Sequence, residues 1–215
     1  MPPDPHGLDL YVGLIHAPLW ALGPGLRVGL WLCGCQRACP DCLSPDFWAE
    51  EAGQKSTVTA LATTLIRLAQ EHKTSALTIS GGEPFGRGLA LLALLKDLRE
   101  TGISDILVYS GFLGQELLAK YPTISTLVTA LVDGAYETLN PSKEIFRGSK
   151  NQKLWLFDQN LKDIYDKWSC QTQRQVQIIA SQGQIRLLGV PKGRDFENIM
   201  DEVASLRPNL PLTLS

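Results

Sequence analysis

The sequence predicts an α/β fold built on parallel strands, and three observations lead to this class. Short apolar runs alternate with longer segments of helical periodicity between residues 26 and 133, in the order of a β-α-β-α-β-α-β chain. The first run, over residues 26–33, is apolar almost throughout, as in a strand covered on both faces. The most unusual segments come directly after the predicted strands, where parallel folds carry their functional groups. We therefore expect four loops to converge on one mouth.

The boundaries of the elements follow from periodicity and from the residues that begin or end them. Ser56 or Thr57 is a plausible N-cap for the first helix. Gly102 ends the second helix, and Pro122 interrupts the third helical region. The predicted helices cover residues 57–73, 87–102 and about 115–129, and the later predicted strands cover residues 76–80, 105–110 and 130–133.

The C-terminal part of the chain has a different pattern. Residues 174–193 predict two strands joined by a turn, and residues 194–207 predict an amphipathic helix. A polar stretch over residues 158–173 joins this small hairpin-plus-helix unit to the rest, either as an added subdomain or as an extension of the sheet. The predicted division is a core over residues 1–157 and a C-terminal extension over residues 158–215.

Composition limits the classes of partner. The chain has 215 residues, a net charge of -2 and 44% hydrophobic residues, so it offers no basic field for nucleic acid. No apolar run reaches the roughly 18 residues that span a bilayer. The first ten residues resemble a proline-stiffened arm and lack the pattern of a secretion signal. We expect a cytoplasmic protein, with no nucleic-acid or membrane partner, in a compartment where thiols stay reduced.

Three of the five cysteines, Cys35, Cys39 and Cys42, lie within eight residues of one another. Such crowding in a reducing compartment predicts a metal or redox site and not a set of disulfides. Structural zinc normally takes four ligands, so a zinc site would need a further ligand such as His16. A 4Fe-4S cluster fits better, because cysteine thiolates hold its irons. A missing fourth thiolate leaves one iron open to a substrate or cosubstrate.

The cysteine spacing together with the sequence SGGEP resembles the radical S-adenosylmethionine (SAM) superfamily. Within that superfamily, further segments resemble the family of the anaerobic ribonucleotide reductase activating protein, in matched order over about residues 10–155. This resemblance implies a partial (β/α) barrel of parallel strands. The segments that carry it are GPGLR (23–27), SPDFW (44–48), SGGEP (80–84), VYSGF (108–112) and LVDGAYETLNPSKEIFRGSKNQ (131–152).

The resemblance also implies roles for individual residues. Cys35, Cys39 and Cys42 would hold one 4Fe-4S cluster, and SAM would bind its open iron. Residues 147–152 would line the far side of the pocket. Ala135 replaces a lysine of the family pattern. The cofactor-binding residues implied by the resemblance are Gly81, Gly82, Glu83, Pro84, Ser110 and Asp133.

Simpler roles are open for some of these residues. Glu83 could cap the helix that follows it, because a carboxylate is favourable at a helix N-terminus. Asp133 could cap the turn after its strand, since Asp-Gly is common turn chemistry. Cys33 is expected to face the core as a small apolar residue.

By resemblance, the chain is a radical SAM oxidoreductase of the glycyl-radical-activating type. An electron from the cluster, supplied by a flavodoxin or ferredoxin, would cleave SAM to methionine and a 5′-deoxyadenosyl radical. That radical would abstract hydrogen from a glycine of a partner enzyme such as anaerobic ribonucleotide reductase. One alternative is a radical SAM enzyme that acts on a peptide or small molecule. Another is a non-catalytic iron-sulfur or zinc binding module.

Overall fold

The computed structural model describes residues 8–181, 184–191, 201 and 212–214. The helices are α1 (Val58–Glu71), α2 (Gly88–Glu100), α3 (Gly114–Lys120), α4 (Ile124–Leu127) and α5 (Lys162–Ser169), with short 3-10 turns η2 (Pro45–Phe47), η3 (Glu50–Ala52), η4 (Pro84–Arg87) and η5 (Gln159–Leu161). The strands are β1 (Asp9–Leu19), β2 (Arg27–Leu32), β3 (Gln54–Thr57), β4 (Ala76–Gly81), β5 (Asp105–Tyr109), β6 (Ala130–Asp133), β7 (Lys153–Leu156), β8 (Val176–Ser181), β9 (Gln184–Gly189) and β10 (Leu212–Leu214).

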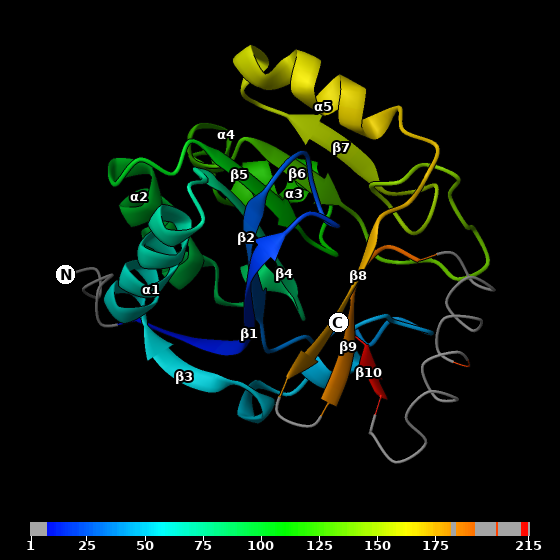
Figure 1. The fold of residues 1–215 in the computed structure, drawn as a ribbon, viewed down its shortest axis with the longest axis horizontal. Helices are drawn as coiled ribbons and strands as arrows, with labels where there is room; N and C mark the ends of the chain where they lie inside the picture. Colours follow the sequence, from blue (N-terminus) through cyan, green and yellow to red (C-terminus); the bar gives the residue numbers. More distant parts are fainter. Residues whose placement is uncertain (1–7, 182–183, 192–200, 202–211, 215) are drawn as a thin grey trace.

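Two sheets organise the described residues (Figure 1). The larger has seven strands in the order β3-β1-β2-β4-β5-β6-β7, and the smaller has the order β10-β9-β8. Strands β2, β4, β5 and β6 are parallel to one another, whereas β1, β3 and β7 add antiparallel strands at the two edges. The predicted α/β class with a parallel central sheet is therefore confirmed. The large sheet is open at β3 and β7, so these strands form no closed barrel.

Both faces of the central strands are covered, as the continuous apolar runs predict. In β5, Ile106 and Val108 belong to the cluster that includes the buried side chains of α1 and α2. Leu107, between them, packs on the opposite side with Phe146 and Trp168. This alternation follows from the two-residue period of a strand. Figure 1 shows α1 and α2 together on one side of the sheet and α5 beside β7.

The predicted helices begin and end close to the expected residues. The hydroxyl of Thr57 accepts a hydrogen bond from the amide of Ala60 at 3.3 Å, so Thr57 is the N-cap of α1. Gly102 follows α2 with φ of +96°, a conformation that favours glycine. The region around Pro122 separates α3 from α4, as its missing amide hydrogen predicts.

Several elements were not expected from the sequence. Strand β1 begins at Asp9, within the segment that resembled an arm, and the polar connector contains α5. Helix α5 is polar overall and buries only Tyr165 and Trp168, so its sequence resembles an exposed connector. The hairpin predicted over residues 174–193 is confirmed as β8 and β9, in a sheet of its own. The helix predicted over residues 194–207 lies outside the described residues except for residue 201.

A buried polar network holds α5 against the amino ends of the parallel strands. The fully buried guanidinium of Arg27 donates to Asp105 at 2.6 Å and to the hydroxyl of Thr78 at 2.7 Å. The hydroxyl of Tyr165, in α5, donates to the other oxygen of Asp105 at 2.6 Å. This network lies at the end of the sheet away from the cysteines. Among the described helices, none has the length and apolar character needed to cross a membrane.

Candidate functional site

One pocket collects the loops that follow the four parallel strands. The space between its walls measures about 920 Å³, and this figure includes the part that is open to solvent. The lining residues that follow β2, β4, β5 and β6 are Cys35, Cys39, Cys42, Gly81, Gly82, Glu83, Ser110, Gly111, Gly134 and Tyr136. The expected convergence of four loops on one mouth is thus borne out.

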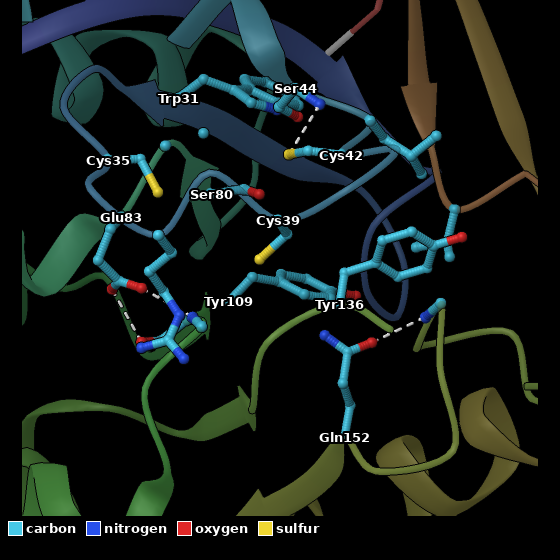
Figure 2. A pocket seen from close by; sticks show the side chains of 18 of the residues that line it. Trp31, Cys35, Cys39, Cys42, Ser44, Ser80, Glu83, Tyr109, Tyr136 and Gln152 are labelled. Carbon is cyan, nitrogen blue, oxygen red and sulfur yellow. Dashed lines mark hydrogen bonds between the residues drawn. The ribbon is translucent and has the colours of Figure 1, made fainter. Parts of the chain in front are cut away.

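The three cysteines present their sulfur atoms to the same space, as Figure 2 shows. Burial raises the pKa of the Cys35 thiol, while backbone hydrogen bonds from residues 37 and 38 oppose that shift. The sulfur of Cys42 accepts a hydrogen bond from the amide of Ser44 at 3.4 Å. Amide hydrogens directed at cysteine sulfurs are a recognised means of tuning iron–sulfur sites.

The backbone between the cysteines adopts an unusual conformation. Ala38 and Asp41 have positive φ angles of 45° and 54°, a region that side chains other than glycine rarely occupy. Such residues persist only where the surroundings fix them, and they concentrate at functional sites. The loop therefore holds three thiols toward one space at some cost in backbone energy.

The donor set fits a cluster better than a single ion. Within the described part of the chain, no three side chains of His, Cys, Asp or Glu are grouped closely enough to hold one metal ion. The cysteines of a 4Fe-4S cluster bind different irons and so surround a larger object. His16 does not line this pocket, and its ring nitrogen Nε2 lies 2.9 Å from the side-chain nitrogen of Gln177. The structure thus gives no support to a zinc site completed by His16.

Gly81 and Gly82 lie where the end of β4 packs closely against the backbone on either side of the cysteine loop. A Cβ atom at Gly81 would lie 2.3 Å from the carbonyl oxygen of Leu32, and Gly81 also has φ of +111°. A Cβ atom at Gly82 would lie 2.5 Å from the carbonyl oxygen of Phe47 and 2.9 Å from that of Gly34. The close approach of neighbouring backbone atoms therefore requires glycine at both positions, whether or not a ligand binds there.

Glu83 links the loops after β4 and β5. It is only 5% exposed, and its carboxylate accepts hydrogen bonds from the hydroxyl of Ser110 at 2.8 Å and the amide of Gly111 at 2.7 Å. It also caps η4 by accepting from the amide of Phe85 at 3.0 Å, so the simpler capping role is real. Burial raises the pKa of this carboxyl, and the three hydrogen bonds counteract the shift. Glu83 lines the pocket while performing both roles.

Two predicted site residues lie apart from the others. Pro84 is buried at the start of η4 and lines a neighbouring hollow, which shares Cys35 and Glu83 with this pocket. Asp133 is 3% exposed, and its oxygens accept from the amides of Gly114 at 2.6 Å and Lys153 at 3.0 Å. Asp133 is not among the residues that line the pocket, and its contacts match those of a cap for α3.

The far wall of the pocket contains residues that the sequence reasoning missed. Gly148 and Gln152, from the predicted loop, line it as expected. Tyr109 also lines it, and its buried hydroxyl has no hydrogen-bond partner among the described residues. Burial raises the pKa of this phenol, so it stays protonated and is a donor. Trp48 also lines the pocket, and its buried ring nitrogen likewise lacks a partner among the described residues. Tyr109 belongs to the segment VYSGF and Trp48 ends the segment SPDFW, so membership of these two segments was the available signal.

Two buried donors near the pocket lack partners among the described residues. Buried polar atoms in proteins nearly always have partners, so such exceptions call for a ligand, an ion or water. Protein atoms cover both the Tyr109 hydroxyl and the Trp48 ring nitrogen almost completely, so a molecule in the pocket does not reach either atom directly.

The fold and the pocket define an α/β protein with a cysteine-rich site at the carboxyl ends of its strands. A family model described as a 4Fe-4S single cluster domain matches residues 21–155. The chain is also similar to proteins named anaerobic ribonucleoside-triphosphate reductase-activating protein. That of Escherichia coli K12 is 32% identical over 136 residues, which cover 60% of this chain and 88% of the relative. That of enterobacteria phage T4 is 29% identical over 136 residues, which cover 62% and 85%.

A third relative of the same name, from Pasteurella multocida, is 33% identical over 145 residues, covering 64% of this chain and 91% of its own. The chain belongs to the 4Fe-4S single cluster domain family, together with these activating proteins. The resemblance drawn from the motifs is confirmed, and an iron–sulfur cofactor is supported.

Proposed function

We propose that this chain is a 4Fe-4S cluster- and SAM-dependent radical enzyme that activates a glycyl radical enzyme such as an anaerobic ribonucleotide reductase. One observation carries the proposal: three cysteines from a single loop face the same pocket as the double-glycine loop, in a chain of this family. When bound, the cluster and SAM supply one-electron chemistry that removes a hydrogen atom from the target. The fold supplies position and a partly enclosed space.

The proposed cluster ligands are Cys35, Cys39 and Cys42. Their sulfurs face the pocket, and amides of the same loop are directed at two of them. A ligand set of three leaves one iron for the cosubstrate, which is how a metal site becomes catalytic.

SAM is proposed to bind against the loop after β4. Gly81 and Gly82 expose backbone there, and Glu83 presents a buried carboxylate to the same pocket. A carboxylate has about four acceptor positions, of which three are used, so it can still accept from an amino group. Ser110 fixes the orientation of Glu83 and also lines the pocket. Pro84 and Asp133 are proposed to support the site by fixing η4 and α3.

The finer structural expectations belong to the same proposal. The open sheet from β2 to β6 would serve as the partial barrel of a radical SAM core, within residues 1–157. Residues 158–215 would be an extension of that core. We also propose a cytoplasmic location, because reduced thiols and a reduced cluster require a reducing compartment. The proposed reductant is a flavodoxin or ferredoxin. The proposal includes no nucleic-acid or membrane partner.

The test is anaerobic incubation of the reconstituted protein with reductant and SAM. Formation of 5′-deoxyadenosine above the level of a Cys35→Ala control is the expected result. Absence of any excess over that control would refute the proposal and favour a non-catalytic iron-sulfur module. Release of 5′-deoxyadenosine that no glycyl radical enzyme stimulates would favour a peptide or small-molecule substrate instead.

A further inference from the structure

The C-terminal extension contributes part of the pocket wall. Gly189, the last residue of β9, and Val190 line the same pocket as the three cysteines. We propose that the β8–β9 hairpin completes the SAM pocket, with Val190 in contact with SAM and Arg174 as the residue that positions this wall. The inference rests on the proposed function, because it takes SAM to be the ligand.

Arg174 ties the hairpin to the loop that forms the far side of the pocket. Its guanidinium donates to the carbonyl oxygen of Val190 at 2.7 Å. It also donates to the carbonyl oxygens of Ser142 at 2.8 Å and Arg147 at 3.1 Å. The planar guanidinium carries five N–H donors in a fixed arrangement, so one side chain can join several carbonyl groups. The loop it holds continues to Gly148, which lines the pocket.

The opposite side of the hairpin is fixed next to the cysteine loop. Leu188 is fully buried in a cluster that contains Trp31 and Phe47. The guanidinium of Arg186 lies 5.8 Å from the centre of the Phe47 ring, within the range of a cation–π contact. The side-chain amide of Gln177 donates to the carbonyl oxygen of Pro18 at 2.8 Å. The hairpin therefore contacts the loop that contains Arg147 on one side and the cluster that contains Phe47 on the other.

The backbone at Gly189 brings the chain close to β8. Its φ is +137°, and a Cβ atom there would lie 2.8 Å from the carbonyl oxygen of Gln175. Only glycine fits this conformation and this close approach. The chain therefore passes close to the residue before β8 as it leaves β9. This path places Val190 at the pocket.

This wall lies outside the part of the chain that the family model describes. The match ends at residue 155, whereas Arg174, Gly189 and Val190 come from the extension. The extension therefore has a specific role in cosubstrate binding, which the core motifs alone do not predict.

The experiment measures SAM affinity of the full-length, cluster-reconstituted protein by anaerobic isothermal titration calorimetry. Arg174→Ala removes the positioning contacts, and Val190→Trp fills the wall directly. Both variants are expected to weaken SAM binding about tenfold or more, the size of one lost charge-assisted hydrogen bond or an equivalent steric conflict. Arg174→Lys is expected to recover part of the loss. Gln175→Ala, an exposed neighbour on the same segment, is the matched control and is expected to bind SAM as the wild type does.

Iron content, the melting temperature and the SAM-induced change in the EPR spectrum separate positioning from general stability. Weakened SAM binding at unchanged iron content and melting temperature supports the inference. If Arg174→Ala loses iron, the SAM affinity of Val190→Trp alone decides whether the hairpin forms part of the SAM pocket. Wild-type affinity in every iron-loaded variant overturns the inference while the proposed function stands. No SAM binding by the wild-type protein overturns the proposed function and this inference with it.

Discussion

Replacement of Gly82 by alanine tests the joint between the cysteine loop and β4. The added methyl group would lie 2.5 Å from the Phe47 carbonyl oxygen and 2.9 Å from that of Gly34. Both are backbone atoms, so no side chain can rotate away, and overpacking of this kind costs about 1–3 kcal/mol. Displacement also weakens the hydrogen bonds from Gly82 to Leu32 at 2.7 Å and from Glu83 to Gly34 at 2.9 Å, at about 1 kcal/mol each.

The expected total is therefore about 3 kcal/mol or more, which for a chain of this size lowers the melting temperature by roughly 6–12 °C. The assays are thermal unfolding by circular dichroism and iron content after anaerobic reconstitution, both of which are expected to fall. Gly86→Ala is the matched control, because the nearest atom to its added Cβ is 3.7 Å away, an ordinary contact. Gly82→Ala with the melting temperature and iron content of Gly86→Ala would refute the reasoning.

Three further predictions concern stability, pH dependence and ligand binding. Asp105→Ala leaves the buried Arg27 guanidinium without its carboxylate and is expected to reduce the free energy of unfolding by about 3–5 kcal/mol in urea titrations. Burial lowers the pKa of His16, so the folded state binds its proton less readily than the unfolded state. Stability is therefore lost as pH falls below about 6.5, and His16→Gln, beside Gln177, is expected to flatten this dependence. Tyr109→Phe removes a buried hydroxyl that has no partner among the described residues, so it is expected to change the free energy of unfolding by less than about 1 kcal/mol and to leave SAM binding unchanged.

Each of these predictions has a contradicting result. The exposed pair of Lys96 and Glu100, at 3.8 Å, is the comparison for Asp105, and Glu100→Ala is expected to cost no more than about 1 kcal/mol. Equal effects of the two substitutions would contradict the buried-network account. Parallel pH profiles of wild type and His16→Gln would contradict the assignment to His16. A loss of more than about 1 kcal/mol of stability in Tyr109→Phe, or weaker SAM binding, would contradict the view that this hydroxyl is unpaired and out of reach of the pocket.

The central parallel strands could be predicted from the sequence because their cause is local. Each of β2, β4, β5 and β6 is a short apolar run, and each cap or stop residue lies beside the element that it begins or ends. Strand β1 was missed although it pairs with β2, the next strand in the chain, whereas helix α5 depends on a contact with a distant part of the chain. Tyr165 in α5 is buried because it meets Asp105, 60 residues earlier, and no local pattern signals that contact.

The site divides in the same way. The grouping of Cys35 with two further thiols at one pocket was predictable, since all three lie within one loop. Asp133 was assigned to the site by family resemblance, but its side chain accepts a hydrogen bond from the amide of Gly114 in α3. The contribution of Val190 was not predictable, because a hairpin about 150 residues beyond the cysteine loop reaches the pocket only through tertiary packing.

The most direct test of the central claim is anaerobic EPR spectroscopy of the reduced, reconstituted protein with and without SAM. The account predicts the signal of a single 4Fe-4S cluster that changes on addition of SAM and is lost in Cys35→Ala. A four-iron signal that SAM leaves unchanged, or one bound zinc with no sulfide, would contradict it.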